Sequence, residues 1–239
     1  MIIAAAAIAA AVLSAHGSTP ATSLSRLPAR LGRDALRVVT TKTPGLVLAA
    51  GGVAAAVVHP ADQRTVTKLS NSSGADLFFD AGADTGDGTV QFGAAIVIYA
   101  AGLVAHRQRV AEVGTALVEA QTLNAAITGT TKVIADRTRP DGGMHSFPSG
   151  HASAAFATAD VLMQQFGPKV GIPAYAGAAY VAISRLSEKQ HFLSDVVFGS
   201  AVGIASARAV VMRTSRRSVA VTPAPLRGGG AVFVAVSAR

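Results

Sequence analysis

The sequence predicts an all-α protein, a helical bundle of about six helices. Six segments are apolar and dominated by alanine and glycine. Turn signals separate these segments, such as His59-Pro60 after the first and Gly167-Pro168 after the fourth. The segments cover residues 44–58, 92–105, 111–130, 151–165, 171–184 and 196–212. Because a chain of 239 residues can bury one sizeable core, we expect a single helical domain with tails.

The regions around this bundle differ in composition. We expect the helical domain to cover residues 44–217, after a basic lead segment at 18–43. Residues 1–17 are a candidate signal peptide or N-terminal anchor, although no Lys or Arg precedes their apolar run. That run is shorter than the ~20 residues that a membrane-spanning helix needs. Residues 218–239 are predicted to be a flexible C-terminal tail, with a short strand at 231–236 as the alternative.

The charge of the chain indicates an anionic partner. Lys and Arg number 21 against 13 Asp and Glu, which gives a net charge of +8. Aromatic residues make up only 5% of the chain, Trp is absent, and no basic and aromatic platform is recognisable, so we expect no nucleic-acid partner. A phospholipid surface or a phosphate substrate explains the charge more simply. Cysteine is absent, so the chain has no disulfide or thiolate site.

The first chemical motif is the stretch from Lys132 to Pro140, Lys-Val-Ile-Ala-Asp-Arg-Thr-Arg-Pro. Lys132 and Arg139 are about two helical turns apart, so they would share one helix face and could reach a single anion. Pro140 is expected to stop the helix. The alternative is a solvated basic helix end, which also accounts for Arg137.

The second motif, Ser-Phe-Pro-Ser-Gly-His at residues 146–151, reads as a loop that leads into a helix N-terminus. Pro148 and Gly150 break regular structure, and Ser149 can cap the helix. The N–H groups of the first turn would form an anion site, with His151 beside it. The alternative is a capped helix start with an incidental histidine. His145 could line the entrance or simply be solvated.

The third motif places Arg185, His191 and Asp195 in one short stretch. In a helix, His191 and Asp195 form an i,i+4 pair on one face. The carboxylate can then accept the Nδ1 proton of the imidazole and leave Nε2 bare as a nucleophile. The alternative is a surface helix pair worth only ~0.3–0.5 kcal/mol, which needs no function.

The three motifs in this order resemble the signature of the type 2 phosphatidic acid phosphatases. That superfamily also contains bacterial acid phosphatases and vanadium haloperoxidases. The pattern is Lys-x6-Arg-Pro, then Pro-Ser-Gly-His, then Ser-Arg-x5-His-x3-Asp, and every signature position between Lys132 and Asp195 is filled.

The resemblance implies a role for each of these residues, with the active site on loops and helix ends at one end of the bundle. His191 would attack phosphorus, Asp195 would orient it, and His151 would protonate the leaving oxygen. The phosphate would be bound by Lys132, Arg139, Ser149, Gly150 and Arg185. No metal or other cofactor is expected, because the cationic side chains take the electrostatic role of a metal ion.

The resulting function is a phosphatase that acts on a phosphate monoester or pyrophosphate, with a lipid phosphate as the expected substrate. One alternative is a haloperoxidase with vanadate as its cofactor, and another is a soluble secreted acid phosphatase. A third is a membrane-binding scaffold with an inactive site, which the complete signature disfavours. Specificity is expected in the loops at 59–90 and 141–147; the first of these is rich in Asp, Gly and Ser and is predicted to be solvated and largely irregular.

Basic residues lie in alternate connections between the predicted helices. If the six segments span a membrane, the positive-inside rule places these connections in the cytoplasm and the three motifs on the opposite side. Several segments are shorter than ~20 residues, which would suit a soluble secreted bundle instead. We expect a membrane protein of the cell envelope, with the periplasmic or secreted soluble form as the alternative. The sequence indicates no oligomeric state.

Overall fold

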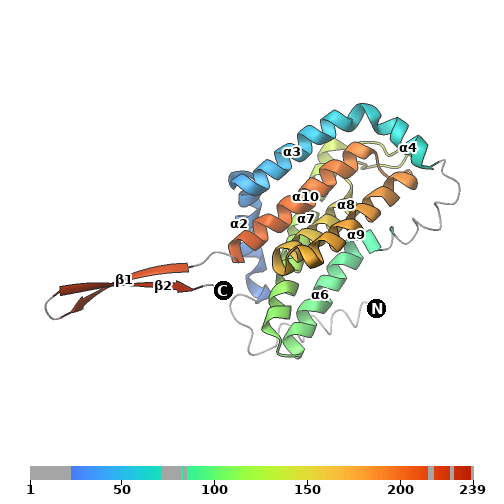
Figure 1. Cartoon of the computed structure of the whole chain (residues 1–239). Coiled ribbons are helices and arrows are strands. Elements are labelled where there is room, and N and C mark those ends of the chain that lie inside the picture. The colour runs from blue at the N-terminus through green and yellow to red at the C-terminus, as the bar shows by residue number, and fades with distance from the viewer. Residues whose placement is uncertain (1–22, 71–81, 83–84, 215–217, 227–228, 238–239) are drawn as a thin grey trace.

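The protein is an all-α bundle, as the sequence predicts, in a computed structural model that describes residues 23–70, 82, 85–214, 218–226 and 229–237 (Figure 1). The candidate signal peptide or anchor at 1–17 lies outside the described residues. All six predicted segments are helical. They correspond to α3 (Lys42–Val58), α6 (Gly88–Val104), α7 (Gln108–Ala135), α8 (Gly150–Phe166), α9 (Pro168–Ser187) and α10 (Leu193–Thr214).

Local signals explain where several of these helices begin and end. Asp87 caps α6, because its side chain accepts hydrogen bonds from the N–H groups of Thr89 at 2.8 Å and Val90 at 3.2 Å. Gly167 ends α8 with a φ of 74°, a value that favours glycine. Pro168 then opens α9 at a position where its missing N–H costs nothing.

Helices α2 (Leu27–Thr40) and α4 (Asp62–Ser70) were not predicted. Helix α2 occupies the basic lead segment, where Arg30 donates to Glu119 of α7 at 2.7 Å inside the protein. Helix α4 lies in the segment that we expected to be irregular and solvated. That expectation is wrong for α4, because Asp62 and Val66 are buried. Short 3₁₀ turns precede the two helices at Leu24–Arg26 and His59–Ala61.

The C-terminal region forms a β-hairpin where we expected a flexible tail. Strand β1 (Ser218–Leu226) pairs antiparallel with β2 (Gly229–Ser237), and Val221 lies opposite Val234. The alternative of a strand at 231–236 falls within β2. β-Branched valines recur along both strands and favour extended structure. Figure 1 shows the hairpin projecting away from the helices.

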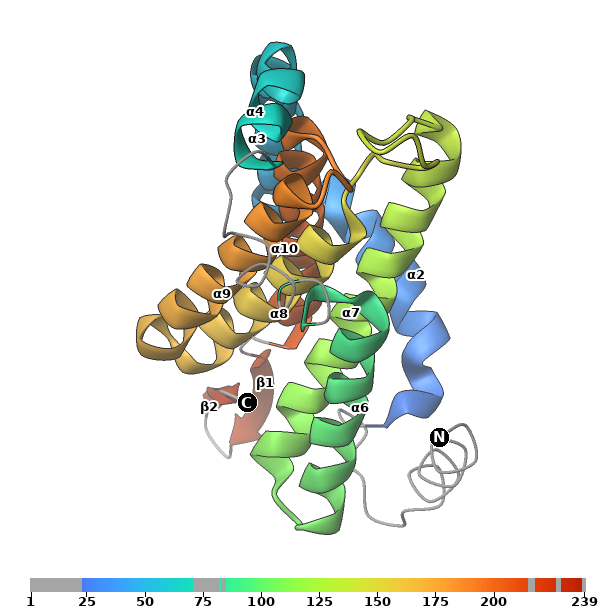
Figure 2. The same ribbon diagram turned by 90° about the vertical axis from the view of Figure 1, so that its right-hand side faces the viewer.

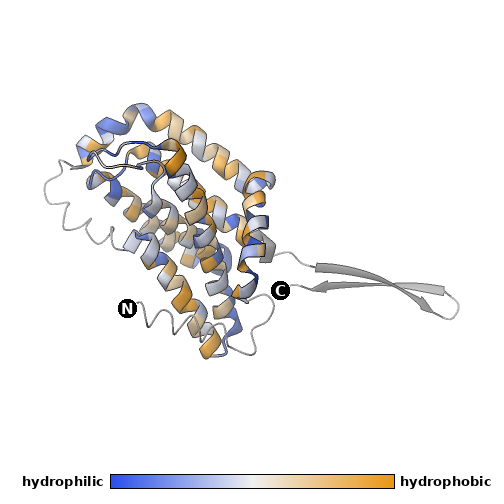
Figure 3. Cartoon of the chain, turned by 180° about the vertical axis from the view of Figure 1, so that it is seen from behind, coloured by the Kyte–Doolittle hydropathy of each residue, from blue (hydrophilic) through white to orange (hydrophobic). Residues whose placement is uncertain are grey.

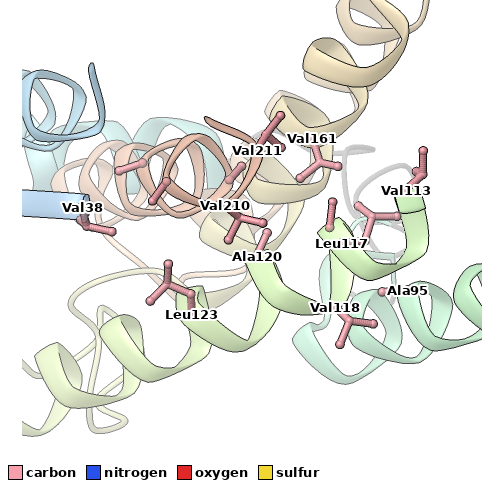
Figure 4. Close-up of a cluster of buried hydrophobic side chains, with 14 residues drawn as sticks. Val38, Ala95, Val113, Leu117, Val118, Ala120, Leu123, Val161, Val210 and Val211 are labelled. Atoms are coloured by element: carbon pink, nitrogen blue, oxygen red, sulfur yellow. The ribbon is translucent and has the colours of Figure 1, made fainter. Parts of the chain in front are cut away.

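The core of the bundle lies between α7, α8 and α10, with α6 and α2 packed around them. Leu117 and Val118 of α7, Val161 of α8 and Val210 of α10 belong to one buried cluster (Figure 4). Most of the other buried residues in this cluster are alanine or valine. Small side chains allow the helix axes to approach closely, so the position of each helix is set by backbone contact as well as by side-chain packing.

Helix α10 contacts the first turns of α8 through two glycines. A Cβ atom added at Gly199 would lie 2.5 Å from the carbonyl oxygen of Ser149, and one at Gly203 would lie 2.1 Å from that of Ser153. Only a residue without a side chain permits this approach. The start of α8, which carries the second motif, is thereby held against the start of α10.

Within the described part of the chain, two helical stretches are long and apolar enough to cross a membrane. They are Lys42–Ser70, which includes α3 and α4, and Leu193–Val211 in α10. In the first stretch only 17% of the apolar window is buried, whereas in the second 72% is buried, as in the core helix of a soluble protein. Leu46, Val53 and Val57 of α3 are exposed. Figure 3 shows hydrophobic residues along much of this helix.

The close approach of α10 to α8 can be tested with Gly203→Ala. We expect the added methyl group to separate the two helices and to lower the free energy of unfolding by ~1–3 kcal/mol, measured by thermal denaturation. The matched control is Gly129→Ala in α7, where an added Cβ has no neighbour within 4 Å. This control should be neutral or stabilising by up to ~1 kcal/mol. Equal melting temperatures for Gly203→Ala and the wild type would contradict the packing argument.

Candidate active site

The three motifs meet at one end of the bundle. Lys132 lies in the last turn of α7, His151 in the first turn of α8 and Arg185 in the last turns of α9, while Asp195 lies in the first turn of α10. Figure 2 shows the end of α7 and the loop that follows it close to the start of α10. This placement on helix ends and loops agrees with the prediction from the sequence.

His191 faces Asp195, but not within one helix as we expected. Helix α10 begins at Leu193, so His191 lies in the connection before it, where its N–H donates to the carbonyl of Arg185 at 3.2 Å. The Nδ1 atom of His191 lies 3.8 Å from Oδ2 of Asp195, beyond hydrogen-bond distance, and has no hydrogen-bond partner among the described residues. The residue is only 2% exposed, so the alternative of a surface pair is wrong. Burial lowers the pKa of His191, which favours the neutral imidazole that a nucleophile requires.

Asp195 connects the site to its surroundings through both carboxylate oxygens. Its Oδ2 accepts hydrogen bonds from the hydroxyl of Ser146 at 2.5 Å and from the N–H of Phe192 at 2.8 Å. Its Oδ1 accepts from Nη1 of Arg137 at 2.6 Å. The bond to Phe192 closes the first turn of α10, as an acidic residue at this position of a capping box does. Asp195 is fully buried, and its partners fix its orientation.

Two residues of this network were not identified from the sequence. Arg137 was attributed to a solvated helix end, but its side chain is only 24% exposed and it bridges Asp195 and Asp62. Asp62 belongs to the segment that we expected to be solvated, yet it accepts hydrogen bonds from the N–H and the hydroxyl of Ser194. Arg137 could have been noticed because it lies inside the first motif. No sequence signal distinguished Asp62 from the other acidic residues of its segment.

Lys132 and Arg139 reach the site by different routes, not from one helix face as we expected. Helix α7 ends at Ala135, and Asp136 turns the chain with a φ of 39°. Lys132 donates to the carbonyl of His145 at 2.6 Å, and an added Cβ at Gly150 would lie 3.8 Å from its Cε. Burial and the nearby charge of Arg139 lower the pKa of Lys132 to about 8.

Arg139 and Arg185 are the other two cations of the site. Nη1 of Arg139 donates to the side-chain oxygen of Gln190 at 2.5 Å, and its buried Nε has no hydrogen-bond partner among the described residues. Arg185 is buried, pairs with Glu188 and lies 3.3 Å from the hydroxyl of Ser184. The positive charges of Arg139 and Arg185 both act on His151.

His151 lies where the second motif predicts, beside a helix N-terminus. Ser149 is buried and its hydroxyl caps α8 by accepting the N–H of Ala152 at 3.4 Å, while Gly150 is the first residue of the helix. Nε2 of His151 lies 3.9 Å from a carboxylate oxygen of Asp87. Burial, with the charge of Arg185, lowers the pKa of His151 to about 4. The side chain of His145, in the preceding loop, is 45% exposed, and its Nδ1 lies 3.3 Å from Asp136.

The arrangement suits binding of an anion. Three cations and a helix N-terminus surround two histidines that burial keeps neutral. A bound anion would raise the pKa of both histidines, because a nearby negative charge favours the imidazolium form. His151, which has the more exposed side chain, could then donate a proton to a group on that anion.

Comparisons with known proteins agree with this geometry. Residues 141–218 match the family model of the PAP2 superfamily, a range that includes the second and third motifs. The lipid A 1-phosphatase of Porphyromonas gingivalis is 42% identical over 72 residues, which are 28% of this chain and 16% of that protein. The chain therefore matches only a small part of this curated relative.

Two solved structures have a similar fold. The crystal structure of Aquifex aeolicus LpxE matches 63% of this chain and 94% of its own, with a TM-score of 0.55 and 23% identity. The transmembrane PAP2-type phosphatidylglycerolphosphate phosphatase from Bacillus subtilis matches 79% of this chain and 94% of its own, with a TM-score of 0.53 and 20% identity. The resemblance predicted from the three motifs is thus confirmed by the match of residues 141–218 to the PAP2 superfamily model.

Proposed function

We propose that the protein is a phosphatase that removes a phosphate group from a lipid phosphate or pyrophosphate through a phosphohistidine intermediate on His191. The observation that carries this proposal is the position of His191. Its Nδ1 faces the buried carboxylate of Asp195, so its Nε2 is left to react. The charges of Lys132 and Arg139 act on the same imidazole.

In the first step, Nε2 of His191 attacks phosphorus and the bond from phosphorus to the leaving oxygen breaks. His151 gives its proton to that oxygen, so the product leaves as a neutral alcohol or as a protonated phosphate. Asp195 stabilises the positive charge that develops on His191 and holds its Nδ1 proton. The 3.8 Å separation between Nδ1 of His191 and Oδ2 of Asp195 would shorten when the imidazolium forms.

In the second step, water replaces His191 on phosphorus. His151, which lost its proton in the first step, accepts one from the attacking water. The nitrogen–phosphorus bond breaks, inorganic phosphate forms, and both histidines return to their initial state. The cations Lys132, Arg139 and Arg185 stabilise the phosphoryl oxygens in both transition states, together with the N–H of Gly150 and the hydroxyl of Ser149.

The names of the relatives support a phosphatase over the haloperoxidase alternative. They are a lipid A 1-phosphatase and a phosphatidylglycerolphosphate phosphatase. Both names refer to lipid phosphates, which agrees with the apolar outer face of α3. In the proposed reaction the site cations neutralise the phosphate, so no step requires a metal ion or vanadate.

We also propose that the site opens on the side of the membrane away from the cytoplasm. Arg109 donates to the carbonyl of Gln165 at 2.8 Å and lies over the ring of Phe166, so the α6–α7 and α8–α9 connections are adjacent. Helix α7 has 28 residues and therefore spans about 40 Å, which separates these basic connections from Lys132 at its other end. By the positive-inside rule, the basic end faces the cytoplasm.

The roles of the two histidines can be separated with substrates that differ in their leaving group. His191→Ala should abolish release of phosphate from all esters. His151→Ala should slow turnover of an alkyl phosphate by ~10²–10⁴-fold but affect a nitrophenyl phosphate much less, because nitrophenolate leaves without a proton. Initial rates give both comparisons. The control is His106→Asn, outside the site, where asparagine tolerates the backbone φ of 51°. Full activity in His191→Ala would rule out the mechanism.

The pKa of Lys132, about 8, predicts how phosphate binding depends on pH. Lys132 is charged below this pH and loses its charge above it. The inhibition constant of inorganic phosphate should therefore rise above pH 8, by up to about tenfold per pH unit. In Lys132→Arg the guanidinium keeps its charge, so the rise should move to higher pH. The same pH dependence in both proteins would show that Lys132 does not bind the phosphate.

Membrane association can be tested by fractionation of cells that express the full chain. We expect the protein to remain in the membrane pellet after a high-salt wash and to be released only by detergent, because apolar contact is insensitive to salt. Release by salt alone would indicate a peripheral protein. Recovery in the soluble fraction would favour the secreted acid phosphatase.

A further inference from the structure

We propose that Asp62 and Arg137 are positioning residues that hold Asp195, and through it His191, in the geometry for attack. This inference rests on the proposed function, since it assigns a role in that reaction to residues outside the three-motif signature. Neither residue is among the groups that we propose to bind the phosphate. Their effect reaches the reaction through the carboxylate of Asp195.

Arg137 joins two buried carboxylates with its planar guanidinium group. Nη1 donates to Oδ1 of Asp195 at 2.6 Å and to the hydroxyl of Ser194 at 2.8 Å. Nη2 donates to Oδ2 of Asp62 at 2.8 Å. The guanidinium carbon also lies 4.2 Å from the centre of the Phe192 ring, so the group is held on one face as well as along its edge. A lysine could not make both bonds in this fixed geometry.

Asp62 attaches this arginine to the start of α10. Its Oδ1 accepts the N–H of Ser194 at 2.8 Å, and its Oδ2 accepts the hydroxyl of Ser194 at 2.6 Å. The N–H of Ser194 is one of the helix-terminal donors that have no partner within the helix. Asp62 is 4% exposed and comes from α4, so it fixes α4 and Arg137 to the turn that carries Asp195.

The two carboxylate oxygens of Asp195 contact different partners. Oδ2 faces His191 and already accepts from Ser146 and Phe192, whereas Oδ1 accepts from Arg137. Without Arg137 the carboxylate could turn about its side-chain bonds, and its negative charge would lose a buried counter-ion. Without Asp62, Arg137 would lose the hydrogen bond from its Nη2 atom, which helps to set the orientation of the guanidinium group.

The two residues carry opposite charges, so their loss should move the pKa of His191 in opposite directions. Loss of the negative charge of Asp62 makes the imidazolium less favourable and lowers this pKa. Loss of the positive charge of Arg137 makes it more favourable and raises this pKa. The other charged or titratable groups around His191 stay the same in both variants. They are Lys132 from α7, Arg139 from the loop, His151 from α8, Arg185 from α9 and Asp195 from α10.

The experiment compares Asp62→Asn and Arg137→Gln with the wild-type full chain in detergent. We expect kcat to fall by about 10–100-fold in each variant, the range known for loss of outer-shell partners that orient histidines at metal sites. The inhibition constant of inorganic phosphate should change by less than about twofold, because the phosphate-binding cations remain. The acidic limb of kcat/KM, where His191 must lose its proton, should move to lower pH in Asp62→Asn and to higher pH in Arg137→Gln.

Asp160→Asn is the matched control. Asp160 is a fully buried aspartate that also pairs with an arginine, Arg208 at 3.3 Å, and accepts the Tyr175 hydroxyl at 2.6 Å. It lies ten residues after Gly150 along α8, about 15 Å from the phosphate-binding end. This variant should lose stability in thermal denaturation and keep the wild-type kcat and pH profile below its melting temperature.

The inference is wrong if kcat is unchanged in Asp62→Asn, or if both variants move the acidic limb in the same direction. It is also wrong if the variants weaken inhibition by inorganic phosphate while kcat stays the same. An inactive wild type would contradict the proposed function, not this inference. In that event the titration of the His191 ring by NMR, assigned with His191→Ala, decides: opposite pKa shifts in the two variants support the network, and equal or absent shifts refute it.

Discussion

The rest of the site depends on the hydrogen bonds that satisfy the buried carboxylate of Asp195. Burial of an ionised group is costly unless its oxygens are paired and hydrogen-bonded. The partners of Asp195 come from the two ends of the α7–α8 connection and from its own helix start. Those segments can satisfy one carboxylate only if they meet at one place. The hydrogen bonds that neutralise Asp195 therefore also bring the three motifs together.

The packing of the bundle provides the frame for this meeting point. Gly199 and Gly203 let α10 lie against the backbone of α8, so the helix that carries Asp195 and the helix that carries His151 cannot shift independently. Ser149 strengthens the same contact, because its N–H donates to the carbonyl of Asp195 at 3.0 Å. Small residues in the helices thus have a direct consequence for the distance between nucleophile and acid.

The sequence predicted the site residues that lie in short motifs, but it did not predict contacts between residues far apart in the chain. Residues Lys132, His151, Arg185, His191 and Asp195 were identified because each lies in a compact motif with its neighbours. Asp62 meets Arg137 across 75 positions of sequence, and no local pattern marks such a pair. Expected helix geometry also failed at two motifs, because α7 ends before Arg139 and α10 begins after His191. Loops, and not continuous helix faces as the sequence suggested, therefore place Arg139 and His191 in the site.

The charges around the site explain why an anion is needed to complete it. Burial, together with the positive charges of Lys132, Arg139 and Arg185, favours the neutral forms of the two histidines. Neutral His191 can attack, but neutral His151 cannot act as an acid. A phosphate dianion would compensate these positive charges and raise the pKa of His151 from about 4 towards the range in which it carries a proton. Asp195, held by Arg137, lies where it can stabilise the imidazolium that His191 forms during attack. The substrate would therefore supply the negative charge that lets His151 act as an acid, while Asp195 and Arg137 support the developing charge on His191.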